Sequence, residues 1–238
     1  MKIWLKTTLT IAVLGLAACQ STPSVGLNSG DLARNQRAIL AQIASQPQQA
    51  DLYFDADGQY RSTPAVGGYY RKVLGQTANG GWVVQDFYQD SQAKQIDPAI
   101  IFHPNGLRNF NNDVIDGPVT WYRPDGTVMQ SAHYQRGKNH GWVTYYDEQG
   151  RARLAIELAD DAANGNQKAF DEQGRLVMQV SVGDGQQVKQ EFWYGNGKPA
   201  AVWAEDGVQG WDEQGKPLTG AQAGRLISYL ESRLYQPE

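Results

Sequence analysis

The chain has 238 residues, of which 19% are charged and 11% aromatic, and its formal net charge is −4. An acidic chain lacks the excess of Lys and Arg that phosphate backbones attract, so these values argue against nucleic acid as a partner and against electrostatic adhesion to anionic lipid. The length is enough for one sizeable β domain or two small ones.

The N-terminus has the pattern of a targeting segment. Lys2 and Lys6 form a positive region, and residues 9–18 are a short apolar run. Such a run is too short to span a bilayer as a permanent helix, so it indicates a signal peptide. The run ends in the letters LAAC, residues 16–19, which resemble the bacterial lipobox of lipoproteins. We therefore predict a lipoprotein signal peptide over residues 1–18, with an ordinary signal peptide cut at the same place as the alternative.

Cys19 is the only cysteine of the chain. The lipobox resemblance implies that its sulfur carries diacylglycerol and its amine a further acyl chain, and each buried methylene adds about 0.8 kcal/mol of membrane affinity. Gln20 follows in place of Asp, which in enterobacterial-type sorting indicates the outer membrane. We therefore expect a lipid-anchored protein of the bacterial cell envelope, at the outer membrane and facing the periplasm. Removal of residues 1–18 changes the formal net charge from −4 to −6.

The next segments are a tether and a helix. Residues 19–30 are rich in Ser, Pro and Gly and are expected to link the lipid to the folded domain. Residues 31–46 are predicted to form a helix that ends before Pro47. We expect its apolar stripe to pack on a sheet rather than on a partner. The stripe consists of Leu32, Gln36, Ile39, Leu40 and Ile43.

The second half of the chain repeats one short phrase, in which an aromatic residue is followed by polar turn-formers and then by Gly. Clear copies occupy residues 122–126, 146–150, 170–174, 194–197 and 211–215, and their glycines are 24, 24, 23 and 18 residues apart. Worn copies occupy residues 52–58, 87–92 and 102–106. A period in the twenties indicates stacked repeats, so we predict one repeat domain over residues 50–218.

Each repeat is predicted to be a β-hairpin. After a Gly turn, residues 128, 130, 132 and 134 alternate with residues 129, 131 and 133, as expected for a strand with two different faces. Asn-Gly, Asp-Gly and Gln-Gly pairs suit tight hairpin turns. The elements are too short to include a crossover helix, which excludes a parallel sheet. The predicted fold is mainly β: an elongated antiparallel β-meander of repeated hairpins with an N-terminal and a C-terminal helix.

The C-terminal helix is predicted over residues 219–235. Leu226, Ile227, Leu230 and Leu234 fall on one face at helical spacing. Thr219 at the start of the helix and Gln222 three residues later form a capping box. Because an open meander needs its last strands covered, we expect this helix to cap the repeat domain.

Residues 137–151 resemble the bacterial variant of the MORN repeat. That unit has a Gly-Lys turn, a His-Gly pair, a hydrophobic strand that ends in paired aromatic residues, and a polar turn closed by Gly and a basic residue. The matching positions are Gly141, Trp142, Tyr145, Tyr146, Gly150 and Arg151. The resemblance implies an elongated, twisted antiparallel sheet. It also implies a role among lipoproteins of unknown function or antitoxin components of toxin–antitoxin systems.

Aromatic residues are the candidate binding residues. Neighbouring members of a pair on a strand must point to opposite faces of the sheet, so one row packs and the other is exposed unless something covers it. Rigid aromatic side chains carry much of the binding energy at interfaces, so an exposed row suits a protein or a glycan. Packing in the core is the alternative for each residue. The candidates are Trp121, Tyr122, Trp142, Tyr145, Tyr146, Trp193 and Trp203.

No motif in the sequence indicates catalysis, a metal or a cofactor. The three histidines, His103, His133 and His140, lie in turns or on an outer strand face and lack the spacing of metal ligands. The run of residues 55–58 resembles the start of a calcium loop, but position 66, where the loop needs Glu, is Val66. No Gly-x-Ser-x-Gly elbow is present. The sequence therefore predicts no catalytic residues and no enzyme.

From these features we expect a membrane-anchored periplasmic lipoprotein that acts as a non-catalytic protein-binding module. Its partner would be a protein that meets an extended acidic and aromatic surface, and a specific version is an antitoxin or immunity protein. The alternative is a structural scaffold of the envelope that contacts peptidoglycan or lipid.

Overall fold

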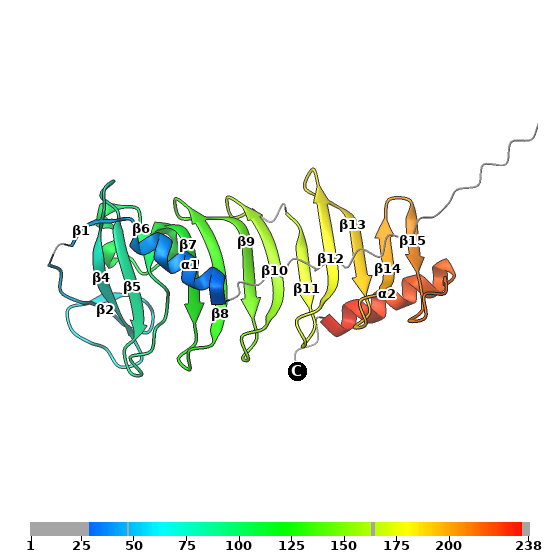
Figure 1. The fold of residues 1–238 in the computed structure, drawn as a ribbon, viewed down its shortest axis with the longest axis horizontal. Helices are drawn as coiled ribbons and strands as arrows, with labels where there is room; N and C mark the ends of the chain where they lie inside the picture. Colours follow the sequence, from blue (N-terminus) through cyan, green and yellow to red (C-terminus); the bar gives the residue numbers. More distant parts are fainter. Residues whose placement is uncertain (1–28, 47, 163–164, 235–238) are drawn as a thin grey trace, which may run out of the picture.

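The computed structural model describes residues 29–46, 48–162 and 165–234. The signal peptide, Cys19 and most of the predicted tether lie outside these residues. The described chain forms one 15-stranded antiparallel sheet with a helix near each end (Figure 1). This confirms the predicted meander with two helices. Among the described residues, no helix has the length and apolar character that crossing a membrane requires.

The strands from β4 onward follow one another through the sheet in chain order, each paired with its neighbours along the chain. At the other end, β1 and β2 share the outer edge of β4, and β3 pairs with β2. Two 3-10 helices, η1 (Pro104–Arg108) and η2 (Asn112–Val114), lie between β6 and β7. The strands are β1 (Ile43–Ser45), β2 (Leu52–Phe54), β3 (Tyr60–Arg61), β4 (Tyr69–Thr77), β5 (Trp82–Tyr88), β6 (Ala99–Ile101), β7 (Ile115–Tyr122), β8 (Val128–Gln135), β9 (Lys138–Tyr146), β10 (Ala152–Ala159), β11 (Gln167–Phe170), β12 (Leu176–Gly183), β13 (Gln186–Trp193), β14 (Pro199–Ala204) and β15 (Gly207–Gly210).

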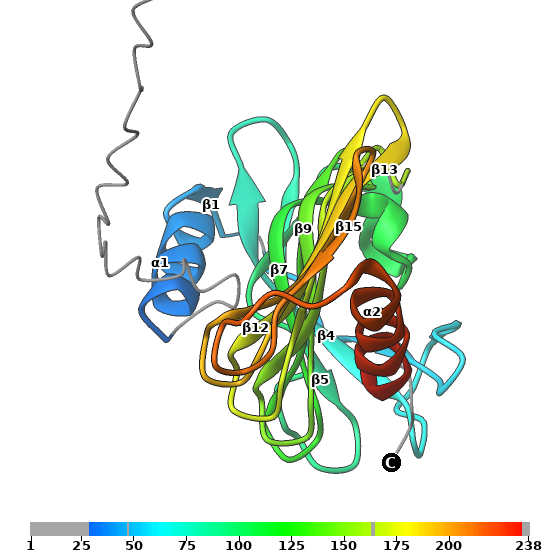
Figure 2. The same ribbon diagram turned by 90° about the vertical axis from the view of Figure 1, so that its right-hand side faces the viewer.

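The two helices cover opposite faces of the sheet (Figure 2). Helix α1 (Ser29–Leu40) is shorter than the predicted range 31–46, because residues 43–45 form β1 and pair with the free edge of β4. Helix α2 (Gly220–Leu234) lies within the predicted range. At its start the backbone N–H of Gln222 donates to Thr219 Oγ1 and the backbone N–H of Thr219 donates to Gln222 Oε1, which is the reciprocal capping box.

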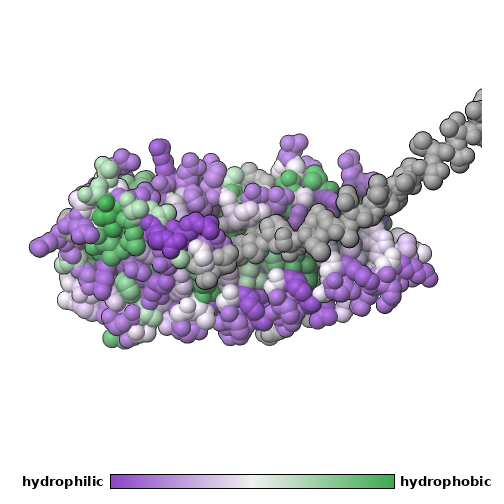
Figure 3. Space-filling model, viewed as in Figure 1, coloured by the Kyte–Doolittle hydropathy of each residue, from purple (hydrophilic) through white to green (hydrophobic). Residues whose placement is uncertain are grey.

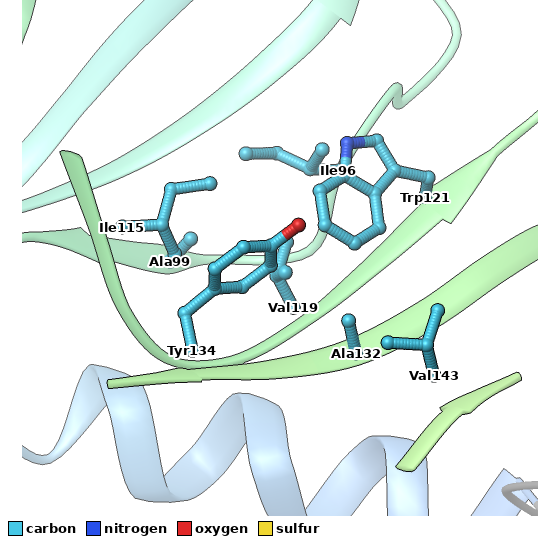
Figure 4. Packing of buried hydrophobic residues seen from close by; sticks show 8 residues of the cluster. All are labelled: Ile96, Ala99, Ile115, Val119, Trp121, Ala132, Tyr134 and Val143. Carbon is cyan, nitrogen blue, oxygen red and sulfur yellow. The ribbon is translucent and has the colours of Figure 1, made fainter. Parts of the chain in front are cut away.

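Alternation along the strands gives the sheet two faces, which we name after the helix on each. The α2 face carries Val119, Ala132 and Val143 in one apolar cluster, and Met178 and Phe192 in another. Figure 4 shows the first cluster, with α1 on the far side of the sheet. Helix α2 packs on the second cluster through Ile227. On the α1 face, Ile39 of α1 packs against Val83 and Ile100.

One hairpin turn recurs seven times, and six of these copies explain the repeated phrase; the seventh is the turn at Gly80, between β4 and β5. In each copy a Gly with φ between 74 and 92° donates its backbone N–H to the carbonyl three residues before it. In four copies that earlier residue is Asp, and its Oδ1 accepts two further backbone N–H groups; Asp147, for example, accepts from Gln149 and Arg151 at 3.1 and 2.8 Å. The four are Asp55, Asp147, Asp171 and Asp212.

The structure also aligns the fourth copy of the phrase differently. Gly197 donates to the carbonyl of Tyr194, so Tyr194 occupies the Asp position of the turn and Trp193 is the aromatic residue of that copy. Of the worn copies, residues 52–58 contain the complete turn around Asp55. The turn after β5 is longer, and Gln92 takes the positive φ, at 58°. The third worn copy continues into η1.

The repeat predicts that one whole unit can be removed. Deletion of residues 151–174 joins Gly150 to Arg175, which follows its turn in the same way that Arg151 does. Because each strand of the array pairs with its nearest neighbours, we expect a folded protein, less stable and shorter by two strand spacings, about 10 Å. Circular dichroism and small-angle scattering check this. Deletion of residues 151–162 removes a single strand, so every later strand would have to run in the opposite direction, and we expect this variant not to fold. If the two deletion variants give the same circular dichroism and scattering, the repeat model is wrong.

The turn carboxylates predict a dependence of stability on pH. Backbone N–H groups lower the pKa of Asp55 and of Asp125 below the ordinary value of 3.8. For Asp171 burial acts in the opposite direction, but the backbone N–H and guanidinium of Arg175 outweigh it and the pKa is also lowered. A carboxyl group whose pKa is lower in the folded state stabilises the fold above pH 3.8, and that contribution disappears as pH falls through the folded pKa.

We therefore expect the melting temperature to be flat from neutral pH to about pH 4 and to fall at lower pH. The variant Asp171→Asn keeps an oxygen that can accept the turn hydrogen bonds but does not titrate. Its melting curve measured at several pH values should decline less steeply below pH 4 than that of the wild type. If the melting temperature falls equally below pH 4 in the wild type and in the variant, Asp171 does not contribute to the pH dependence.

Candidate functional site

The seven candidate aromatic residues divide by exposure. Trp121, Tyr122 and Tyr146 are buried, with 7%, 6% and 7% of their surface exposed. Trp142 and Trp193 are partly buried. Tyr145 and Trp203 are exposed, at 42% and 37%. Packing therefore accounts for three of the seven, and the remaining four are accessible to a ligand.

Strand register places the four accessible residues on two different faces. Tyr145 pairs with Leu154, which pairs with Ala169 of the cluster under α2, and Trp203 pairs with Gln190, which pairs with Val180 of that cluster. Both therefore lie on the α2 face. Successive side chains of a strand point to opposite faces of the sheet. Trp142 and Trp193 are each next to a residue of the α2 face, so both lie on the α1 face. The four accessible candidates thus form two separate pairs, one exposed on the α2 face and one partly buried on the α1 face.

The α2 face is apolar where the two rings lie. Tyr145 stands beside Leu154 and Ile156, which are partly buried strand residues. The segment that holds η1 and η2 and helix α2 both lie on this side of the sheet (Figure 2). Trp203 pairs with Val208, which packs with the cluster under α2. These contacts make the α2 face largely an extension of the core.

The α1 face is polar beyond helix α1. One cross-strand line runs from the buried Thr144 through Ala155, Lys168, Gln179 and Glu191. The side chains of the last three are partly buried and reach the surface of β11, β12 and β13. We call Lys168, Gln179 and Glu191, with Ser181 and Lys189 beside them, the polar strip. The visible surface on this side is mostly hydrophilic, with an apolar patch at the β4–β5 end and smaller apolar areas toward the middle (Figure 3).

The charges of the polar strip compensate one another. Lys189 Nζ lies 2.7 Å from Glu191 Oε1. Glu157, on the neighbouring line, accepts a 2.9 Å hydrogen bond from Asn166 Nδ2. Lys168 Nζ lies 5.0 Å from the centre of the Trp142 ring, a cation–π contact. With Glu157 counted beside the strip, two lysines face two glutamates, so this part of the α1 face is close to neutral.

Tyr122 belongs to a buried polar cluster beneath α1. Its hydroxyl donates to Asp97 Oδ2 at 2.7 Å, while Lys94 Nζ and Gln36 Nε2 donate to Asp97 Oδ1 at 2.6 and 2.7 Å. Burial, and then the hydrogen bond to Asp97, raise the pKa of Tyr122 strongly, so its hydroxyl stays protonated. Because Gln36 lies on α1, the cluster ties this helix to β7. Asp97 was missed at the sequence level, since no local pattern marks it.

A second buried pair closes the N-terminal end of the sheet. The guanidinium of Arg71 donates to both carboxylate oxygens of Asp86 at 2.7 Å and to the carbonyls of Leu107 and Asn109 at 3.0 and 2.9 Å. The rings of Phe54 and Phe110 lie 5.2 and 5.4 Å from it. All of these hydrogen-bond partners belong to the fold itself. The pair therefore holds the segment that contains η1 on the sheet. The sequence pattern did not indicate it.

The histidines do not converge. His103 Nδ1 accepts the backbone N–H of Asn105, His133 is exposed on β8, and His140 Nδ1 is 3.9 Å from an oxygen of Asp160. Within residues 29–46, 48–162 and 165–234, no three His, Cys, Asp or Glu side chains lie close enough to hold a metal ion. The Asp of the run resembling a calcium loop, Asp55, serves its own turn.

Comparisons with known proteins found no matching family model and no matching curated protein. Several solved structures match in part. The S. aureus TarM G117R mutant in complex with fondaparinux, alpha-GlcNAc-glycerol and UDP is 11% identical, with a TM-score of 0.29 over 50% of this chain and 22% of that chain. The accessory secretory proteins 1, 2 and 3 of Streptococcus pneumoniae give 17% identity and a TM-score of 0.32 over 50% and 24%. A GtfA/B complex bound to UDP and GlcNAc gives 10% identity and a TM-score of 0.16 over 82% and 32%.

These matches contradict two predictions from the sequence. Two of the matched structures are complexes with UDP, and beside them the non-catalytic protein-binding module, in its antitoxin and scaffold versions alike, is not retained, and neither is the statement that the chain is no enzyme. The chain spans about a quarter or less of the length of the first two structures described. TM-scores this low assign no reaction to this chain.

Proposed function

We propose that this protein is a lipid-anchored protein of the bacterial cell envelope that binds a linear, uncharged glycan along its polar strip. The observation that carries the proposal is the arrangement on the α1 face. There, Lys168, Gln179 and Glu191 follow one another on adjacent strands, with Trp142 and Trp193 at the two ends of the strip.

The chemistry of this face suits sugars. An indole ring offers a flat apolar surface to the C–H face of a pyranose and costs little conformational entropy when it binds. Amide, ammonium and carboxylate groups such as those of Gln179, Lys168 and Glu191 supply both donors and acceptors for sugar hydroxyls. A sheet holds these groups in a fixed array before the ligand arrives, which reduces the ordering cost of binding.

The charge balance supports an uncharged ligand. Lys189 and Glu191 already form an ion pair, and Glu157 is bonded to Asn166. A strongly charged polymer would meet groups of its own sign on either side of each favourable contact. A sugar hydroxyl can donate to the carboxylate and accept from the ammonium group of an ion pair. A neutral glycan can therefore bind beside these groups without breaking their contacts with one another.

The N-terminal features support the location. The apolar run after Lys2 and Lys6 and its ending in Cys19 are those of a lipoprotein signal. A lipid on Cys19 would hold the domain beside a membrane where envelope glycans are concentrated. The resemblance of residues 137–151 to MORN-type lipoproteins supports the same location.

The variant Trp142→Ala tests the glycan site. Loss of one stacking ring should weaken binding about tenfold, which corresponds to about 1.4 kcal/mol. The probes are soluble neutral glucans and β-linked N-acetylglucosamine oligomers, with the carboxylated polymer polygalacturonate for comparison. Isothermal titration calorimetry measures the affinity.

Tyr145→Ala is the matched control, because Tyr145 lies on the same strand but on the α2 face. It should bind the neutral probes as the wild type does. If the wild type binds no neutral polymer, or if both variants lose affinity equally, the α1 face is not a glycan site.

The lipid anchor is tested by Cys19→Ser. A serine cannot form the thioether, so the variant should move from the membrane fraction to the soluble fraction after cell lysis and ultracentrifugation. Substitution of the neighbouring residue, Ser21→Ala, is the control and should leave the protein with the membranes. Membrane retention of Cys19→Ser would show that something other than the predicted lipid holds the protein there.

A further inference from the structure

The two indole rings of the α1 face stand at a fixed separation. Trp142 lies on β9 and Trp193 on β13, four strands away in an unbroken antiparallel order. Neighbouring strands are about 4.8 Å apart, which gives about 19 Å across the sheet.

The rings are also offset along the strands. The line that contains Thr144 of β9 reaches Glu191 of β13. Trp142 lies two residues before this line and Trp193 two residues after it, on strands that run in the same direction. Four residues of strand amount to about 13 Å, so the separation along the diagonal is about 23 Å.

This diagonal crosses the central line of the polar strip at β11. Lys168 on β11 and Gln179 on β12 occupy the central line between the two rings. A ligand that stacks on both rings therefore passes over an ammonium and an amide group, each partly buried and fixed on a strand. A straight, extended chain can follow this path without a bend.

We infer that Trp142 and Trp193 together determine the minimum length of glycan that can bind to both rings at once. This inference rests on the proposed function. A pyranose unit in an extended chain is about as long as one strand spacing, so about five units are needed to reach from one ring to the other. Shorter chains stack on one ring at a time. Longer chains occupy both, and the second contact then forms within the complex, where the effective concentration is high. The two tryptophans are thus specificity-determining residues for chain length.

A ladder of neutral oligosaccharides with two to seven units tests this by calorimetry. For the wild type we expect the affinity to rise by about tenfold or more in one step between three and six units. Trp193→Ala should remove the step and should lower the affinity of the two- and three-unit oligomers by no more than about twofold, because these can still stack on Trp142. Trp203→Ala, on the α2 face, is the control and should keep the step.

The deletion of residues 151–174 provides a second variant that does not alter either ring. It removes two strand spacings from the distance across the sheet and shortens the diagonal from about 23 to about 16 Å, so the step should move to chains about one to two units shorter.

A gradual rise of affinity with length that Trp193→Ala leaves unchanged, or a step that the deletion does not move, overturns the inference while glycan binding stands. Absence of binding by the wild type at every length overturns the proposed function itself.

Discussion

The structure depends on one small interaction, the acceptance of two backbone N–H groups by a turn aspartate. Asp147 Oδ1 does this at 2.8 and 3.1 Å, and Asp171 repeats it at 2.9 Å for both bonds, one unit further along the chain. The bonds fix where each hairpin reverses. Because side chains alternate along a strand, a turn displaced by one residue would exchange the two faces of every strand that follows.

The separation of the two faces follows from this fixed register. The α2 face collects the branched and aromatic residues of the core, and α2 covers its C-terminal part through Ile227. The α1 face keeps hydroxyls, amides and charges, and α1 covers only its N-terminal part (Figure 1). A single sheet therefore presents an apolar side that holds the fold together and a polar side that is available for a ligand.

The N-terminal end is closed by charged groups rather than by repeats. Arg71 is fixed by a carboxylate, by two carbonyls and by two aromatic rings, so its charge is compensated although it is buried. Asp97 accepts hydrogen bonds from Gln36, Lys94 and Tyr122. Breaking such buried pairs costs several kcal/mol, because one charge is left without a partner. At this end of the sheet, these contacts hold η1 on one face and α1 on the other.

The sequence by itself determined the class of the fold, the hairpin repeats, the alternation of β8 and the capping box of Thr219 and Gln222. These features depend on residues close together in the chain, where spacing reflects geometry directly. Only the tertiary structure decided that α1 stops at Leu40, since β1 forms by pairing with β4, a distant strand. It also decided that Trp193, not Tyr194, is the aromatic residue of its repeat. Of the candidate binding residues, the sequence named all seven aromatics but could not separate the buried Tyr146 from the exposed Tyr145, and it did not identify Lys168, Gln179 and Glu191 as one line. The exposure of a side chain and its alignment with residues across the sheet depend on neighbouring strands. A pattern within one short segment of sequence carries no information about those neighbours.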